Sequence, residues 1–142
     1  MYTWEYLKNN ISKNNIILSR LADIQQKYIV NKNNILKKYV TYEDFIKIKY
    51  LKFKAYQINM KIVAIKHKDS LVLNFVLNKY PYNIEKNIKH YILFSIKPLS
   101  ITEQNIIINN LIPQYEFLNI VNNISYRSIK NLWHCHVFVK IS

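Results

Sequence analysis

Two histidines separated by one residue lie near the end of the sequence, in the run Trp133-His134-Cys135-His136-Val137. Side chains two apart on a β-strand project from one face, with backbones about 7 Å apart, so His134 and His136 can act on one ligand. A neutral imidazole can serve as a nucleophile, a proton carrier or a metal ligand. This pair is therefore the first candidate for a catalytic site.

Polar residues before the pair could complete a phosphate site. In a phosphoryl-transfer reaction, His134 would attack the α-phosphorus of a nucleotide or nucleotide sugar, and His136 would orient the phosphate or share its proton. Asn122 and Ser128 could donate hydrogen bonds to the phosphate oxygens. Arg127 or a lysine could neutralise the charge that develops in the transition state. The hypothesis is a histidine-dependent phosphohydrolase or nucleotidyltransferase that takes a phosphorylated small molecule.

A third histidine, His90, opens an earlier strand-like segment, and Tyr82 could wall a pocket beside it. With His134 and His136 it could supply three ligands to zinc or iron, although no carboxylate lies near either motif in the sequence. The structural alternative is that His90 and His136 hydrogen-bond to the backbone or to one another inside the sheet. Cys135 should point to the opposite face as a small core residue. We assign no metal ligand, and the sequence does not identify a cofactor.

The formal net charge of +13 suits a partner that carries phosphates, such as a nucleic acid. Lysines alternate with aromatic residues between Lys47 and Lys54, a pattern that could bind a single strand by attraction and base stacking. The chain has only two arginines, however, and guanidinium is the group that reads bases bidentately. The many lysines and asparagines are also typical of an A- and T-rich genome. The alternative function is thus a non-enzymatic basic module for nucleic acid or a protein, and a generic basic surface is favoured.

The sequence contains no glycine. Neither a Walker phosphate loop nor a Rossmann fingerprint can exist here, because both need glycine where the backbone approaches a phosphate. Turns that require a positive φ should instead use asparagine, which tolerates the left-handed region. The candidates are the pairs Asn9-Asn10, Asn14-Asn15, Asn33-Asn34, Asn109-Asn110 and Asn122-Asn123.

Residues 1–142 are expected to form a single domain. The one cysteine cannot form an intrachain disulfide, and residues 1–10 are too polar for a secretory signal. No window approaches the roughly 18 consecutive apolar residues that a spanning helix needs. We therefore expect a soluble cytoplasmic protein with no membrane partner. The sequence does not indicate an oligomeric state.

Helices are expected mainly in the first half of the chain and strands mainly in the second. The expected helices are residues 4–11 capped by Thr3, an amphipathic segment with apolar positions from Ile17 to Ile35, a helix after Thr41 with Asp44 as a near capping box, and a helix from Ser100 or Thr102 to Leu111. Strands are expected over residues 71–77, 90–96, 115–121 and 132–141, and residues 58–65 are ambiguous. This order predicts an α+β fold with N-terminal helices packed on a small, mainly antiparallel sheet that carries the His-x-His strand.

A series of short motifs runs from about Thr3 to Val139. They are Thr3-Trp4-Glu5, Arg20-Leu21-Ala22 with Tyr28, Asn78-Lys79-Tyr80-Pro81-Tyr82, His90 nine residues after Pro81, and Asn122, Ser128-Ile129 and His134-Cys135-His136-Val137 at intervals of six. In this order and spacing they resemble the fungal N-acetylglucosamine-induced-protein family, a domain family without a settled activity. Lys79 departs from the acidic residue of that pattern, Phe94 from its tryptophan and Asn123 from its proline.

The closing segment is also similar to the histidine-triad nucleotide hydrolases and transferases. Those proteins place a strand with alternating histidines after an asparagine and a serine that contact phosphate. Here Leu132 stands where the first of the three histidines would be. This resemblance implies phosphate binding at Asn122 and Ser128 and covalent chemistry at His134.

Overall fold

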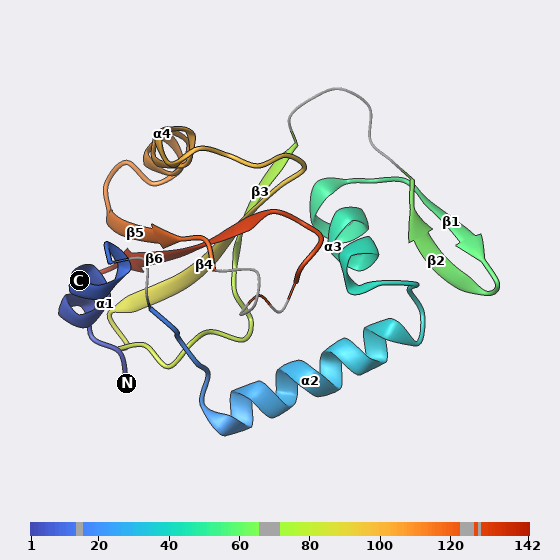
Figure 1. Ribbon diagram of the computed structural model, residues 1–142, viewed down its shortest axis with the longest axis horizontal. Helices are drawn as coiled ribbons and strands as arrows, with labels where there is room; N and C mark the ends of the chain where they lie inside the picture. Colours follow the sequence, from blue (N-terminus) through green and yellow to red (C-terminus); the bar gives the residue numbers. More distant parts are fainter. Residues whose placement is uncertain (14–15, 66–71, 123–126, 128) are drawn as a thin grey trace.

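The computed structural model describes residues 1–13, 16–65, 72–122, 127 and 129–142. Over these residues the elements run in the order α1 (Trp4–Ile11), α2 (Ala22–Leu36), α3 (Tyr42–Leu51), β1 (Ala55–Ile58), β2 (Lys61–Ala64), β3 (Leu73–Leu77), β4 (Ile88–Ser95), α4 (Ile101–Leu111), β5 (Glu116–Ile120) and β6 (His134–Lys140) (Figure 1). The expected α+β class is confirmed, with three helices before the four strands that form the main sheet.

The main sheet has the strand order β3-β4-β6-β5, and every neighbouring pair is antiparallel. The strand with the two histidines, β6, therefore lies inside the sheet, paired on both sides. Its register sets His136 opposite Ile92 and Phe138 opposite His90. His90 and His136 are thus diagonal neighbours on one face, a separation that ring side chains can bridge.

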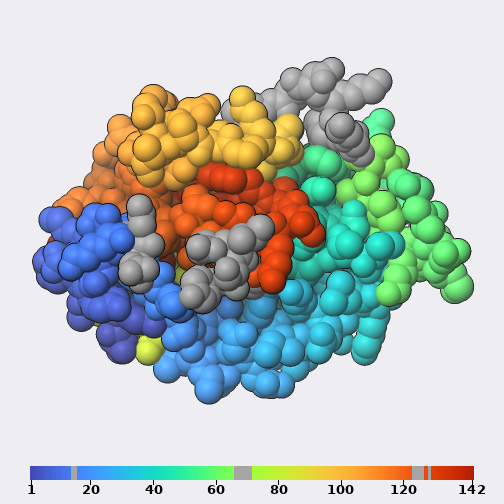
Figure 2. All heavy atoms as spheres, viewed as in Figure 1, coloured from blue at the N-terminus to red at the C-terminus, as the bar shows by residue number. Residues whose placement is uncertain are grey.

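Helices cover both faces of this sheet. Figure 1 shows α4 on one side and the N-terminal helices on the other, and Figure 2 shows α4 along the upper edge of the same view and α2 along the lower edge. Because both faces are covered, β6 is almost continuously buried. A polar side chain on this strand must then find its hydrogen-bond partners inside the protein.

The predicted alternation along β6 is confirmed. Cys135, Val137 and Val139 pack in a core cluster with Ile108 of α4. On the other face, Phe138 packs with Trp4 and Leu7 of α1, and Leu132 packs with Tyr28 and Tyr42 of α2 and α3. His134 and His136 therefore face the N-terminal helices, and Cys135 faces α4.

Helix starts follow the side chains that can cap them. Thr3 accepts a hydrogen bond from the backbone N–H of Tyr6 at the start of α1. Complete capping boxes begin α3, between Thr41 and Asp44, and α4, between Ser100 and Glu103. These reciprocal bonds satisfy N–H groups that have no partner within the helix, which is why the predicted starts hold.

The second helix begins later than its apolar pattern suggested. Ile17 and Leu21 precede α2, and both side chains are more than half exposed. The preceding segment instead bonds to the N-terminal region, where the Tyr2 hydroxyl lies 3.1 Å from Ser19 Oγ. No side chain caps α2, so the pattern carried no start signal.

The ambiguous segment forms a hairpin of β1 and β2, apart from the main sheet. Asn59 and Met60 make its turn, with φ angles of 48° and 67°. Two central residues with positive φ are typical of a two-residue hairpin turn whose twist matches the strands. The expected use of asparagine pairs is wrong for the three pairs in helices: Asn9-Asn10, Asn33-Asn34 and Asn109-Asn110.

Some predictions fall on segments that the structure does not describe. These include Ser128, the pair Asn14-Asn15 and Asn123 of the pair Asn122-Asn123. None of the helices in the described part of the chain has both the length and the apolar character needed to cross a bilayer.

Candidate functional site

The rings of His90 and His136 meet between β4 and β6. His90 Nε2 lies 2.8 Å from His136 Nδ1, and the two residues are 1% and 3% exposed. This contact follows from their diagonal register. It is the arrangement of the structural alternative, in which the histidines hydrogen-bond to one another.

The backbone of Tyr82 determines which nitrogen of each ring carries the proton. The Tyr82 N–H donates to His90 Nδ1 at 3.2 Å, so Nδ1 must carry the lone pair and Nε2 the proton. His90 Nε2–H then donates to His136 Nδ1, which leaves the proton of His136 on Nε2. The nitrogen lone pair of each ring therefore accepts a hydrogen bond from another group of the protein.

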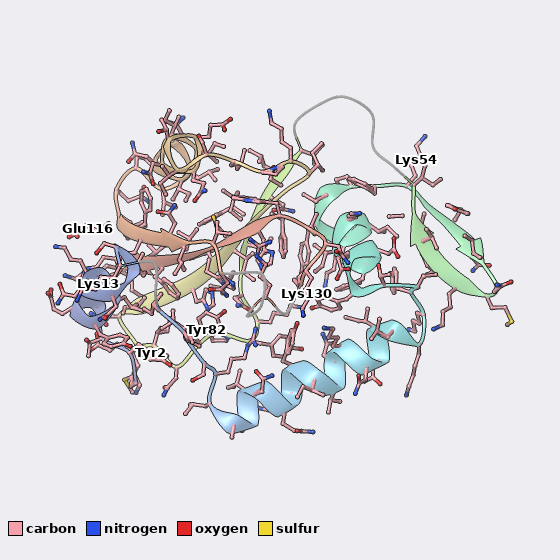
Figure 3. The ribbon with its side chains drawn as sticks, in the orientation of Figure 1. Tyr2, Lys13, Lys54, Tyr82, Glu116 and Lys130 are labelled. Carbon is pink, nitrogen blue, oxygen red and sulfur yellow. The ribbon has the colours of Figure 1, made fainter. Side chains whose placement is uncertain are left out.

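Asn122 and the Tyr82 hydroxyl close the network. The side-chain amide of Asn122 lies 3.2 Å from His136 Nε2 and 3.0 Å from the Tyr82 hydroxyl oxygen. An asparagine amide can present its oxygen or its nitrogen, and the surrounding hydrogen bonds decide which. Here the Asn122 Nδ2 donates to the Tyr82 hydroxyl oxygen. That oxygen lies 3.4 Å from His136 Nε2 and can also accept the proton of the His136 ring. Figure 3 places Tyr82 on the side of the sheet that faces α2.

Burial keeps these groups uncharged. It lowers the pKa of His90 to about 3, with a smaller effect from Arg20. Burial also holds the pKa of His136 well below its usual value, and His90, His134 and Arg20 push it the same way. The pKa of Tyr82 is raised, chiefly by burial. The network is neutral at pH 7, and protonating it would require breaking its hydrogen bonds.

His134 has a different environment from its neighbour. Its Nδ1 donates to the Leu132 carbonyl at 2.9 Å, so the lone pair is on Nε2, at the far end of the ring. No described residue is hydrogen-bonded to Nε2. Burial lowers the pKa of His134, and the hydrogen bond to Leu132 only partly offsets this. The residue thus presents a neutral, oriented imidazole with an available lone pair.

A cavity of about 100 Å³ lies against this histidine, between the sheet and helices α2 and α3. Its lining includes both histidines of β6 and the aromatic rings of Tyr28, Tyr42 and Tyr50. The charged residues of the lining are Arg20, Lys49 and Lys79, and no aspartate or glutamate is among them. The cavity therefore has a cationic character that suits an anion.

The hydroxyl of Tyr28 has no partner. It is the one fully buried side-chain polar atom in the described part of the chain that makes no hydrogen bond, and Tyr28 lines the cavity. The Arg20 guanidinium lies 4.3 Å from the Tyr28 ring centroid, held by a 2.6 Å bond from its Nε to the Tyr80 carbonyl. A buried hydroxyl without a partner costs free energy unless a ligand or water satisfies it.

Of the predicted site residues, His134 and His136 line this cavity, while His90, Tyr82 and Asn122 form the network behind it. Arg127 donates from Nε to the Asn122 carbonyl at 2.7 Å and does not line the cavity.

Sequence reasoning did not predict that Arg20, Tyr28 and Lys49 line this cavity. The first two were already present in the motif that begins at Arg20, and the scarcity of arginine was a signal that this one has a specific place.

The metal hypothesis does not fit this geometry. No group of three histidine, cysteine or carboxylate side chains within the described ranges is placed to hold a metal ion. The lone pairs of His90 and His136 are also occupied by the hydrogen bonds above. Cys135 is a core residue, as expected, and burial raises its pKa to about 12.

The aromatic rings near the lysine-rich segment are packed inside the protein. Tyr50 stacks on Phe94 with centroids 5.6 Å apart, and the Lys49 ammonium lies 5.3 Å from the Tyr50 ring. Lys47 lies over Phe53 at 5.9 Å. Nucleic-acid binding at this segment stays a prediction, and base stacking there would need these contacts to open.

Comparisons with known proteins identify a family and a fold. The family described as "Protein of unknown function (DUF3605)" matches residues 3–115. No curated protein matches the sequence. A solved structure described as "Crystal Structure of HTC1" is similar with a TM-score of 0.69 and 17% identity, over 100% of this chain and 86% of that chain. At this identity the likeness shows the fold alone. The family match includes Arg20, Tyr28 and His90 and ends before β6.

Proposed function

The chain belongs to the DUF3605 family of proteins of unknown function, and we propose that its cavity binds the phosphate group of a small phosphorylated ligand. The observation that carries this proposal is the set of charges in the lining, Arg20, Lys49 and Lys79, without an acidic residue. Such a cavity attracts an anion, and guanidinium and ammonium groups are strong donors to phosphate oxygens.

Size and hydrogen bonding support a phosphate in particular. A cavity of about 100 Å³ holds a cluster of several waters or a group of similar size, since one water needs about 10–15 Å³. It is smaller than the roughly 300 Å³ at which sites for whole small molecules begin. The free Tyr28 hydroxyl would donate to a phosphate oxygen. The rest of the ligand would extend beyond the cavity.

His134 gives this site a candidate reaction. Its Nε2 lone pair would attack phosphorus, so that an Nε2–P bond forms while the bond from phosphorus to the leaving oxygen breaks. The leaving oxygen keeps the electron pair and takes a proton from water. A second water then hydrolyses the Nε2–P bond and frees the imidazole. The Leu132 carbonyl would hold the ring through the charged intermediate, and Arg20 and Lys49 would neutralise the phosphate oxygens.

Binding can be tested with inorganic phosphate and with UDP-N-acetylglucosamine, the latter chosen for the resemblance to N-acetylglucosamine-induced proteins. By titration calorimetry, Lys49→Gln should weaken binding about tenfold or more, because a charge-assisted bond is lost. Lys54→Gln removes the same charge just before β1 (Figure 3), at a residue that does not line the cavity, and should leave binding nearly unchanged. Equal losses in the two variants would mean unspecific attraction to a basic surface and would contradict the proposal.

Tyr28→Phe is a sharper variant, because it removes only the hydroxyl without a partner. Phosphate binding should weaken about two- to tenfold, while the free energy of unfolding of the ligand-free protein stays the same or rises. A loss of stability with unchanged binding would show that the hydroxyl has another role.

The reaction has a separate test. Incubation with a phosphate-labelled nucleotide should transfer label to the protein and release product, and His134→Ala should abolish both while the far-UV spectrum and phosphate binding persist. Turnover that survives in His134→Ala would exclude the covalent step and leave the binding proposal standing.

A further inference from the structure

We propose that the ligand of this protein is a phosphorylated amphiphile, whose aliphatic part lies in a second groove beside the phosphate cavity. This inference rests on the proposed function, since the cavity would hold the phosphate. It adds the chemical class of the remaining part of the ligand.

The groove has a volume of about 420 Å³, within the range of small-molecule sites. It lies between the segment that joins β3 to β4 and the residues around the start of α2. The Asn83 N–H joins the two segments, since it donates to the Ser19 carbonyl at 3.0 Å just before α2. Its apolar lining is largely aliphatic: Leu21, Ile24, Leu77, Pro81, Ile84 and Ile88.

The groove and the cavity share part of their rims. Leu77 and Asn78, at the end of β3, line both. In this proposal the ligand, with its phosphate in the cavity, passes over these two residues into the groove. The cavity is too small for a whole ligand, and the groove that shares its rim offers space for the rest.

The chemistry of the groove favours an aliphatic group over a nucleobase. Leu21 and Leu77 leave 52% and 53% of their surfaces exposed at its rim, so an apolar group would remove that surface from water. The Tyr82 ring, the one aromatic ring other than histidine in this lining, packs against His90 and His136, with centroids 4.7 Å and 5.1 Å away. A planar base would find aliphatic walls and little aromatic surface on which to stack.

The charged residues of the groove agree with an anionic ligand. Glu85 is the acidic residue of the lining, and its carboxylate accepts from the Trp4 N–H at 3.1 Å. Lys86 and Lys89 are exposed. The positive charge at the rim therefore exceeds the negative charge.

The test compares octyl phosphate, octanol, inorganic phosphate and AMP by titration calorimetry, with octyl phosphate below its micelle concentration. Octyl phosphate should bind at least about 100-fold more tightly than inorganic phosphate, since each pair of buried methylene groups gives about tenfold. It should also bind more tightly than AMP or octanol.

Leu21→Ser tests the groove without touching the cavity. Serine is a favoured residue at the N-cap position that Leu21 occupies, so the fold should be kept. The preference for octyl phosphate over inorganic phosphate should fall about tenfold. The matched control is Leu111→Ser at the end of α4, where an equally exposed leucine (52%) lies outside the groove.

The outcomes separate the two proposals. Suppose that phosphate binding depends on Lys49, but the octyl chain gives no gain or AMP binds more tightly. The amphiphile proposal is then wrong, and the phosphate site remains. An octyl preference that is equal in Leu21→Ser and Leu111→Ser also overturns the groove assignment. If octanol binds as well as octyl phosphate and Lys49→Gln has no effect, the phosphate cavity itself is wrong.

Discussion

The two histidines of β6 differ in the nitrogen that carries the proton. His136 is protonated on Nε2 because His90 donates to its Nδ1, whereas His134 is protonated on Nδ1 because that atom faces the Leu132 carbonyl. Side chains on the same face of one strand thus have different chemistry. The lone pair of His134 is available, and that of His136 is occupied.

This assignment can be checked by long-range ¹H–¹⁵N correlation spectra of the imidazole rings at pH 7. We expect the Nε2–H form for His90 and His136 and the Nδ1–H form for His134. Asn122→Ala should disturb the signals of His136 while leaving those of His134 nearly unchanged, because the amide contacts only the His136 ring. A single shared form for all three histidines would contradict the proton order.

At the scale of single residues, the sequence predicted which side chains share a face of the strand. It could not predict which imidazole nitrogens accept hydrogen bonds. The alternation of His134 and His136 is a local property of a strand. The role of His136 depends on the Tyr82 hydroxyl and on Asn122, 54 and 14 positions away. Arg20 and Tyr28 reach the cavity through tertiary packing, so no spacing rule connects them with the histidines.

Among the secondary-structure elements, α3 is joined to the hairpin through one carboxylate. Asp44 Oδ2 accepts from the Thr41 N–H at 3.1 Å, and its Oδ1 accepts from the Ala64 N–H of β2 at 3.0 Å. The equivalent residue of α4, Glu103, accepts from the Ser100 N–H in its own capping box. The two capping boxes are alike, but the carboxylate of the first also accepts a hydrogen bond from β2.

We therefore expect Asp44→Ala to be the more destabilising of the two substitutions. Glu103→Ala should lower the free energy of unfolding only slightly, because this exposed carboxylate serves only its own capping box. Asp44→Ala should cost at least about 1 kcal/mol more, because the Ala64 N–H loses its acceptor. Urea unfolding gives both values, and faster amide exchange at Ala64 should accompany the larger loss. Equal costs would mean that water replaces the Oδ1 contact.

Element boundaries were predictable where side chains mark them. Thr3, Thr41 and Ser100 cap their helices as expected. The start of α2 has no such cap, and the hairpin shows no clear alternation because every residue of β1 is exposed. Such elements depend on their neighbours rather than on local pattern.

For the whole molecule, the buried histidines make stability depend on pH. The pKa of His90 falls from 6.5 to about 3 on folding, so between these values the unfolded chain binds the proton and the folded chain does not. The contribution of neutral His90 to the free energy of unfolding is therefore fully present above pH 6.5 and is lost as the pH falls toward 3. The lowered pKa values of His134 and His136 act in the same direction.

Urea unfolding at pH 7 and at pH 5 tests this dependence. His90 alone should account for a loss of about 2 kcal/mol between these pH values. His90→Gln cannot titrate there, so its stability, although lower at pH 7, should fall less steeply. If residues 1–142 form one domain, each unfolding curve should show a single transition. A pH dependence unchanged in His90→Gln would show that His90 is already protonated in the folded state.

The closed hydrogen-bond network of His90, His136, Tyr82 and Asn122 also limits how this sequence can change over time. Losing one member leaves a buried donor or acceptor without a partner, whereas replacing several members with apolar residues of similar shape can be nearly neutral. Substitutions at these four positions should therefore occur together among relatives. Relatives that lack one of the four residues should usually lack others, and a chain with a single replacement would be a short-lived evolutionary intermediate.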